Sequence, residues 1–245
     1  MAKIVHRDKQ LLVLAKPSGI PTTSPNGRDC LVEVARQLDS NAPLLHPMSR
    51  LDAEVSGLVT FARTRFAIRQ LLAARESGKY RRLYLAISSR APEPLEGIWR
   101  ASIAIDPHEP RRRVVVDDNS RVKGAIRPAI TAYKTLIQLE NAALLSLRPQ
   151  TGRTHQLRVH ASAAAVPFLG DRHYGGLNRV VRSDGRVFRV KRVMLHCARV
   201  VLPDLVNGGR LSLSIGPPED MKQLWTDLGG NDRQLNPSGA NFEAS

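Results

Sequence analysis

The chain is poor in cysteine and in long apolar runs. Only two cysteines occur among its 245 residues, Cys30 and Cys197, far apart and outside any CxxC pairing. A disulfide framework is therefore not expected, and a reducing cytoplasm is the expected compartment. No segment approaches the roughly 20 apolar residues that a membrane span requires, and residues 1–8 lack the apolar stretch of a signal peptide. The sequence predicts a soluble cytoplasmic protein with no membrane partner.

Acidic residues are scarce beside basic ones. The chain has 22 Asp plus Glu against 37 Lys plus Arg, a formal charge of +15, while 42% of its residues are apolar. The apolar share allows a sizeable core and excludes wholesale disorder. A basic excess concerns partners and solubility rather than fold. Polyphosphate partners explain it most simply, although charge alone does not separate nucleic acid from solvated surface charge.

Short strand-like runs separated by turn residues recur along the chain, and the pattern favours an antiparallel sheet over regular βαβ units. Helical spacing marks a smaller number of segments. The predicted strands are residues 11–15, 57–62, 80–87, 98–105, 114–116, 130–139, 143–147, 193–202 and 211–215, and the predicted helices are residues 31–38, a segment from 65, 154–165 and 218–228. The sequence predicts an α+β fold with a mixed, largely antiparallel sheet.

Three side chains are placed to begin helices. Asp29, Thr64 and Thr154 each precede a segment with helical spacing and are predicted N-caps. In the helix after Thr64, Leu71 and Leu72 are expected to face inward. No stretch in the middle of the chain reads as a linker, so residues 1–228 are predicted to form one domain. Residues 229–245 are small and polar and are predicted to be a flexible tail.

An acidic residue lies between an arginine and a Ser-Gly turn in the segment Arg50-Leu51-Asp52, which is followed by Ser56-Gly57. A carboxylate on such a loop suits a nucleophile or a general base. A surface Arg/Asp turn is the plainer interpretation. Glu54, two residues on, also suggests a carboxylate pair of the glycosidase kind, but this spacing in a turn is more often incidental.

A second motif is Thr151-Gly152-Arg153-Thr154-His155-Gln156-Leu157-Arg158-Val159-His160. It is followed by Gly170-Asp171 and by Tyr174-Gly175. An arginine that faces a carboxylate favours its ionised form and fixes its orientation. On its own, the segment fits a solvated basic helix equally well.

Together these segments resemble the RluA-type family of RNA pseudouridine synthases. The order and spacing of the family's motifs hold from about residue 4 to 216, most of the chain. The matching pieces are Lys16-Pro17-Ser18-Gly19, Arg50-Leu51-Asp52 with Ser56-Gly57, Arg82-Leu83-Tyr84-Leu85-Ala86, Thr151 to His160, Gly170-Asp171 with Tyr174-Gly175, and Leu195-His196-Cys197. The resemblance implies a pseudouridine-synthase-like fold and a catalytic domain that stands alone, with no extra RNA-binding domain expected before it.

The resemblance implies a role for each catalytic residue. Asp52 matches the nucleophile that attacks a flipped-out uridine, so that the base detaches, rotates and rejoins through carbon. Tyr84 matches the tyrosine that stacks on the target base, and Arg158 matches the arginine paired with the nucleophile. The implied partner is structured RNA, either tRNA or rRNA. No metal or organic cofactor is expected, because covalent attachment holds the base during its rotation.

The resemblance also implies the residues that bind the substrate. Arg50 matches a residue that fills the gap left by the flipped nucleotide, and Leu195 matches an apolar side chain that lines the uracil pocket. Arg153, His155 and Gln156, from the second motif, complete the expected substrate contacts.

The chain departs from the family pattern beside the expected nucleophile. Ser49 stands where the family has histidine before Arg-Leu-Asp, and Val55 stands where it has threonine before Ser-Gly. Arg82 replaces the usual lysine two residues before the tyrosine. These departures concern rate and substrate choice more than reaction type. A non-catalytic RNA-binding or RNA-chaperone protein on the same scaffold is the alternative, and a DNA-directed base-flipping enzyme is a further one.

Two basic stretches are candidates for RNA binding. The first is the run Arg111, Arg112 and Arg113 with Arg121, Lys123 and Arg127, and the second is the segment from Arg179 to Lys191. Six phosphate contacts give a slope of log affinity against log salt near −4 for single-stranded RNA. Among the seven histidines, His155 and His160 are five residues apart, which is not a metal-ligand spacing on a helix. We therefore expect no metal site, and we expect a monomer.

Overall fold

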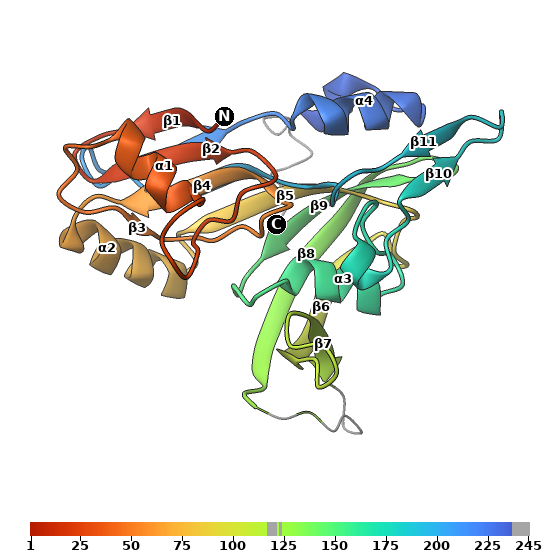
Figure 1. The fold of residues 1–245 in the computed structure, drawn as a ribbon, viewed down its shortest axis with the longest axis horizontal. Coiled ribbons are helices and arrows are strands. Elements are labelled where there is room, and N and C mark those ends of the chain that lie inside the picture. Colours follow the sequence, from red (N-terminus) through yellow and green to blue (C-terminus); the bar gives the residue numbers. More distant parts are fainter. Residues whose placement is uncertain (117–121, 123, 237–245) are drawn as a thin grey trace. The chain divides into compact units, whose positions relative to one another are not determined.

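The structure of the protein, a computed structural model, describes residues 1–116, 122 and 124–236. These residues form two compact units (Figure 1). Unit 1 is made of residues 1–82 and 196–218, and unit 2 is made of residues 83–195 and 219–245. The prediction of one domain over residues 1–228 stays a prediction. Among the described residues, none of the helices has the length and apolar character needed to traverse a bilayer.

Unit 1 is built on a mixed sheet in the order β1-β2-β4-β12, with β3 on β4 and β13 on β12. β12 runs parallel to β4, and the other pairings are antiparallel. All seven residues of β4 are buried, as its apolar sequence predicts. The elements are the strands β1 (Lys3–Arg7), β2 (Leu11–Lys16), β3 (His46–Pro47), β4 (Ser56–Ala62), β12 (Leu195–Pro203, its first residue in unit 2) and β13 (Arg210–Ser214), and the helices α1 (Leu31–Leu38) and α2 (Arg65–Glu76).

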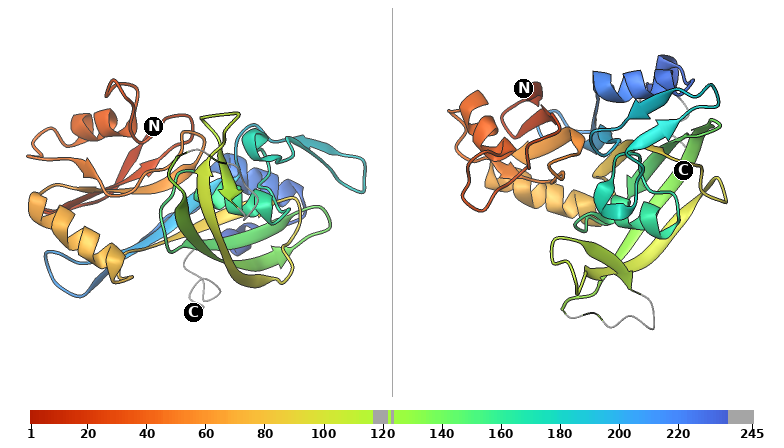
Figure 2. Two further views of the ribbon diagram at one scale, coloured as in Figure 1. Left: turned by 90° about the horizontal axis from the view of Figure 1, so that it is seen from below. Right: turned by 45° about the vertical axis from the view of Figure 1, so that its right-hand side comes forward.

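Unit 2 is built on an antiparallel sheet in the order β5-β9-β8-β6-β7, whose strands are strongly twisted (Figure 2). A separate two-stranded hairpin, β10–β11, belongs to the same unit. The elements are β5 (Arg81–Ser88, its first two residues in unit 1), β6 (Glu96–Ile105), β7 (Arg113–Val116), β8 (Arg127–Gln138), β9 (Ala143–Pro149), β10 (Arg179–Val181) and β11 (Val187–Arg189), the helices α3 (Gln156–Ala163) and α4 (Glu219–Asp227), and the 3-10 turns η1 (Arg172–Tyr174) and η2 (Asp232–Leu235).

The predicted α+β class with a mixed, largely antiparallel sheet is confirmed, and every predicted strand and helix is found within a few residues of its expected bounds. Thr64 caps α2 as predicted, because its side chain accepts from the Ala67 N–H. The other two caps are wrong. The N-cap of α1 is Cys30 and not Asp29, which has left-handed backbone. The N-cap of α3 is His155 and not Thr154, and His155 also has left-handed backbone.

The packing face of α2 differs from the prediction at one position. Leu71 is fully buried, but Leu72 is 46% exposed. Ala67, Leu71 and Ala74 form the buried stripe instead, and their i, i+4, i+7 spacing leaves Leu72 on the opposite side.

The segment that follows α4 packs against it. Trp225 is fully buried, and its Nε1 donates to Gln234 Oε1 at 3.0 Å. Leu235 is also buried. Residues 237–245 of the predicted flexible tail lie outside the described residues, so the prediction of a flexible end stays a prediction.

Candidate active site

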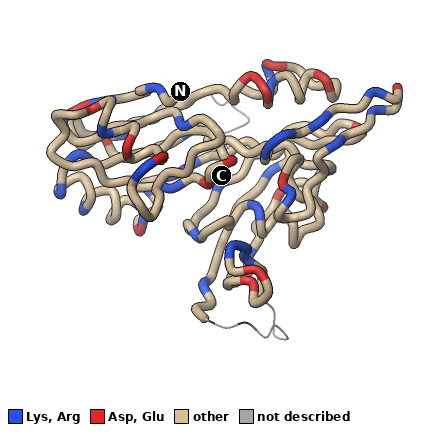
Figure 3. The backbone as a smooth tube through the Cα atoms, in the orientation of Figure 1, with Lys and Arg blue, Asp and Glu red and all other residues tan. Residues whose placement is uncertain are grey.

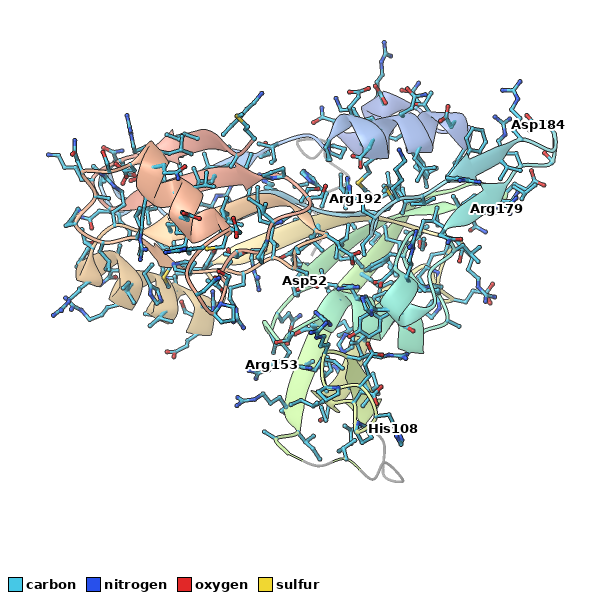
Figure 4. The ribbon with its side chains drawn as sticks, viewed as in Figure 1. Asp52, His108, Arg153, Arg179, Asp184 and Arg192 are labelled. Atoms are coloured by element: carbon cyan, nitrogen blue, oxygen red, sulfur yellow. The ribbon has the colours of Figure 1, made fainter. Side chains whose placement is uncertain are left out.

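The loop that carries Asp52 connects β3 to β4 in unit 1 and is held on both sides of Asp52 (Figure 4). On one side, Thr22 Oγ1 donates to the Leu51 carbonyl at 3.0 Å and accepts from the Leu51 N–H at 2.8 Å. On the other side, the Gly19 N–H donates to the Ala53 carbonyl at 2.8 Å. Both neighbours of Asp52 are therefore fixed to one turn, residues 16–22, and the position of the carboxylate is defined by its backbone.

Lys16 strengthens the same attachment. It is 2% exposed, and its Nζ donates to the carbonyls of Pro17 at 2.9 Å, Ile20 at 2.7 Å and Ala53 at 3.2 Å. Three acceptors match the three hydrogens of an ammonium group. The Lys-Pro-Ser-Gly turn thus acts as a scaffold for the Asp52 loop.

Two departures from the family pattern lie in the core beside this loop. Val55 is 2% exposed and Ser49 is 5% exposed. Ser49 Oγ accepts from the Thr60 N–H at 3.5 Å, a long bond to β4. Because both side chains pack inward, they affect how the loop is supported more than what it presents to a ligand.

The Ser-Gly pair at the start of β4 meets β12 directly. Ser56 Oγ lies 2.9 Å from His196 Nδ1, and both residues are buried. Gly57 has φ +126, and a Cβ there would lie 2.4 Å from the Cys197 backbone. Only glycine permits both the backbone angle and this approach. The Ser-Gly and Leu-His-Cys motifs are therefore two sides of one strand contact.

In unit 2, Arg158 on α3 forms a bidentate ion pair with Asp171. Arg158 Nε and Nη2 donate to Asp171 Oδ2 and Oδ1, both at 2.7 Å, and the two side chains are 4% and 1% exposed. Such a fork fixes the plane of the guanidinium. All six residues from Gln156 to Ala161 are buried, which excludes the solvated basic helix that the sequence left open.

Tyr174 connects this ion pair to the turn before β7. The guanidinium carbon of Arg158 lies 5.0 Å from the centre of the tyrosine ring, and that of Arg112 lies 5.5 Å away. Its hydroxyl accepts from the Arg113 N–H at 2.9 Å and lies 2.8 Å from His155 Nδ1. Tyr174 is 2% exposed, and these contacts join α3 to the turn before β7.

Gln156 ties the start of α3 to β8. Its Oε1 accepts from Thr151 Oγ1 at 2.7 Å and from the Arg153 N–H at 3.0 Å. Its Nε2 donates to the Ile130 carbonyl at 2.9 Å and to Thr131 Oγ1 at 3.0 Å. These four bonds use the full capacity of an amide side chain. We therefore leave Gln156 out of the substrate contacts proposed below.

The motifs belong to a known family. A family model described as RNA pseudouridylate synthase matches residues 10–163. The chain belongs to this family. The match covers Asp52, Tyr84 and Arg158, and it confirms the RluA-type resemblance found in the sequence.

Relatives of this chain are known from bacteria and from humans. It is 31% identical over 173 residues to the dual-specificity RNA pseudouridine synthase RluA of Escherichia coli (strain K12), covering 70% of this chain and 76% of that one. It is 30% identical over 198 residues to the ribosomal large subunit pseudouridine synthase C of Vibrio parahaemolyticus, covering 80% of this chain. The match spans 60% of the Vibrio protein. The structure of human RNA pseudouridylate synthase domain containing 4 has a TM-score of 0.71 at 25% identity and 92% coverage of both chains.

The residues expected at the synthase site fall in both units. Asp52 and Arg50 lie in unit 1, whereas Tyr84, Arg158 and Leu195 lie in unit 2. Tyr84 is 4% exposed on β5, opposite Leu147 of β9. Leu195 is 3% exposed at the start of β12, and Arg50 is exposed.

Two further residues predicted to bind substrate are only partly buried. Arg153 donates from Nε to the Pro128 carbonyl at 3.0 Å, and His155 contacts Tyr174 as described above. Their substrate contacts stay predictions.

The first basic stretch is partly engaged within the protein. Arg112 lies against the Tyr174 ring and 3.8 Å from Asp106, and Arg113 Nη1 donates to the carbonyls of Pro110 and Arg112 at 3.0 and 2.8 Å. Arg111 is exposed. Arg127 is also exposed. Arg121 and Lys123 lie outside the described residues, so an RNA-binding patch here stays a prediction.

His160 is buried in unit 2 and contacts two side chains of the neighbouring sheet. Its Nδ1 lies 3.0 Å from Thr131 Oγ1, and its ring meets Trp99 edge-on. Burial lowers the pKa of His160 to about 4, although the Ala101 backbone opposes part of this effect. Within residues 1–116, 122 and 124–236, no three His, Cys, Asp or Glu side chains gather in a way that suits a metal ion.

Sequence reasoning did not identify Thr22, Lys16 as a buried donor, or Asp171 as the partner of Arg158. A signal existed for Asp171, because it is an acidic residue between Gly170 and a Tyr-Gly pair and follows a predicted helix that contains Arg158. No local signal marks Thr22, since its partner Leu51 is 29 residues away.

Proposed function

We propose that the protein isomerises uridine to pseudouridine in structured RNA, with Asp52 as the nucleophile. The reaction breaks the bond between N1 of uracil and C1′ of ribose and forms a bond between C5 and C1′. A proton leaves C5 and N1 gains one, so the reaction needs no oxidant, reductant or cofactor. The observation that carries the proposal is the carboxylate of a family motif on a loop attached at both of its neighbours, Leu51 and Ala53.

The other roles follow from the match to family motifs. Tyr84 stacks on the extruded base, Arg158 has the role of the arginine that the family pairs with its nucleophile, and Leu195 lines the uracil pocket. The bidentate bond to Asp171 supports the role of Arg158, because it fixes the direction of the remaining guanidinium N–H groups. Arg50, an exposed residue two positions before Asp52, fills the gap left by the flipped nucleotide.

The energetics of base flipping are compatible with these residues. Extruding a base costs a few kcal/mol, and stacking on an aromatic ring returns about 1–3 kcal/mol. Insertion of an arginine into the vacated position offsets more of the cost. The cost of extruding the base and the stabilisation by stacking and insertion are comparable, so no ATP is required. Ribosomal RNA is the first substrate to test, because the Vibrio relative is a ribosomal large subunit synthase by name.

The test compares Asp52→Asn with Glu54→Gln. Both changes remove one carboxylate charge from the same turn, but only the first removes the proposed nucleophile. RNA from cells that lack the protein serves as substrate, and carbodiimide treatment followed by primer extension detects pseudouridine. We expect Asp52→Asn to abolish modification while RNA affinity stays within about threefold, and Glu54→Gln to retain activity.

Two results would contradict the proposal. If wild-type protein binds RNA but forms no pseudouridine, it is a binding protein on the same scaffold. If Asp52→Asn remains as active as wild type, the nucleophile is assigned wrongly.

A further inference from the structure

The β10–β11 hairpin has one face that is exposed, basic and apolar together. In its register Arg179 lies opposite Arg189 and Val181 lies opposite Val187. Directly paired residues share a face, as do residues two apart on one strand, so these four side chains lie on one side. Val181 and Val187 are 53% and 46% exposed. Exposed Lys191 continues the same alternation. We call these five residues, Arg179, Val181, Val187, Arg189 and Lys191, the outer face.

The opposite face of the hairpin packs inward. It carries the pair Val180 and Phe188. Val180 is 4% exposed, and Val190, next in the alternation, is 3% exposed. A hairpin that packs on a protein needs one apolar face, and this inner face provides it. Packing against the core therefore does not explain the two exposed valines on the other face.

The base of the hairpin is joined to the loop that carries Asp171. The Gly170 N–H donates to the Leu177 carbonyl at 2.8 Å, and the Val190 N–H donates to the Asn178 carbonyl at 2.9 Å. A Cβ at Gly170 would lie 1.9 Å from the Arg192 carbonyl. Both ends of the hairpin therefore lie against Gly170, the neighbour of Asp171. Because Asp171 is bonded to Arg158 of α3, the direction of the hairpin is fixed relative to α3.

Two arginines attach the hairpin region to α4. Arg182 Nη1 donates to the Asp227 carbonyl at 3.0 Å, and Arg192 forms a bidentate pair with Asp220 at 2.6 and 2.7 Å. Burial alone would raise the pKa of Asp220, but the hydrogen bonds and charge of Arg192 outweigh it and lower that pKa. In Figure 1 and the left view of Figure 2 the turn of the hairpin extends past the strands of the unit 2 sheet.

Charge is distributed unevenly between the turn and the outer face. Arg182 and Arg186 each lie 3.5 Å from Asp184 at the turn, whereas the outer face contains three cations and no carboxylate among its five residues. Figure 3 shows basic positions along both strands and an acidic position at the turn, and Figure 4 labels Asp184 there and Arg179 nearer the base. Like charges directly opposite each other destabilise a hairpin, so the Arg179–Arg189 pair is unfavourable until an anion lies across it.

We propose that the outer face binds the sugar-phosphate backbone of the RNA helix that flanks the target uridine. The three cations contact phosphates, and the two valines lie against riboses. The wide, shallow minor groove of A-form RNA displays riboses and phosphates to such a surface. Backbone contacts position a protein without reading sequence. The outer face therefore strengthens RNA binding and does not select the uridine. This inference rests on the proposed function.

The test is the triple variant Arg179→Gln, Arg189→Gln, Lys191→Gln. The matched control, Arg65→Gln, Arg69→Gln, Lys79→Gln, removes the same charge from exposed positions of unit 1. Arg186→Gln is a second control within the hairpin turn. RNA affinity is measured with a helical RNA that contains the modified site, between 50 and 200 mM salt.

We expect the triple variant to reduce the magnitude of the salt slope by about 2, since each phosphate contact contributes about 0.7–0.9. KM should rise on the order of tenfold while kcat at saturating RNA is unchanged. The urea midpoint should not fall, because removal of the opposed arginines relieves repulsion. Val181→Thr with Val187→Thr should raise KM less and leave the salt slope unchanged.

Four outcomes decide the matter. A triple variant with the wild-type salt slope overturns the inference, as does a control triple that loses affinity equally. A dimer in sedimentation that the triple variant dissociates identifies a second copy as the occupant and also overturns it. If the triple variant loses RNA affinity and salt slope as expected, but the wild-type protein modifies no uridine, this inference is supported and the proposed function is contradicted.

Discussion

Arg158 and Asp171 form a bidentate ion pair in which both side chains are almost completely buried. Asp171→Asn keeps the size of the side chain but removes the charge that opposes the guanidinium. Breaking a buried pair by removing one partner costs about 3–5 kcal/mol. We expect a loss in the free energy of unfolding near the lower end of that range, because asparagine still accepts one hydrogen bond. Urea denaturation at pH 7 measures it.

The Arg192–Asp220 pair supplies the control for this change. It has the same fork geometry, but the Asp220 side chain is 53% exposed. Solvent-exposed pairs contribute about 0–1 kcal/mol, so Asp220→Asn should cost no more than that. Equal losses in the two variants would show that burial of the Arg158 pair is not what makes it important.

Gly57→Ala tests the contact between β4 and β12. The added methyl group meets the Cys197 backbone at 2.4 Å, and φ of +126 is strained for any residue with a Cβ. We expect a loss of more than about 3 kcal/mol in the free energy of unfolding, since both strain and overlap contribute. Gly78→Ala is the control, with φ +68 and nothing within 4 Å. It should cost only about 1–2 kcal/mol.

Thr22→Val tests the attachment of the Asp52 loop. Valine has the shape of threonine but makes neither of the two hydrogen bonds with Leu51. An unsatisfied buried group costs about 1–3 kcal/mol, and a looser loop should lower kcat on the order of tenfold while KM changes little. Thr22→Ser keeps the hydroxyl and should retain kcat. A serine variant as slow as the valine variant would mean that packing, not the hydrogen bonds, positions the loop.

Local features of the fold followed from the sequence because they depend on near neighbours. The fully apolar run of β4 and the Thr64 cap are two such cases. The wrong caps have a local cause that composition does not reveal, because Asp29 and His155 adopt left-handed backbone. The β10–β11 hairpin was missed as structure because its strands, Arg-Val-Val and Val-Phe-Arg, are only three residues long and lie in a segment rich in arginine, which also fits a basic surface segment.

The same distinction between local and distant partners applies to the candidate site. The residues of the motifs were found, but the contacts that support them were not. Thr22 and Leu51 are 29 residues apart, and Ser56 and His196 are 140 apart. Such partners are chosen by the sheet order, which brings β12 beside β4, and no spacing rule along the chain predicts them.

His160 should make stability depend on pH. Its pKa is lowered to about 4 in the folded protein, against about 6.5 in an unfolded chain. Between these values the unfolded state binds more protons, so the free energy of unfolding falls as pH decreases from about 6.5 to about 4. The full difference amounts to about 3 kcal/mol. Above pH 6.5 both states are neutral at this residue and the contribution is complete.

His160→Asn isolates this contribution. Asparagine retains an acceptor for Thr131 but does not titrate, so the variant loses a roughly constant amount of stability at neutral pH. Its unfolding free energy should then fall less steeply than that of wild type between pH 6.5 and 4, and the two curves should converge. Urea denaturation at half-unit pH intervals gives both curves. Parallel curves across this window would mean that folding does not change the pKa of His160, and the burial of its ring would then not control its charge.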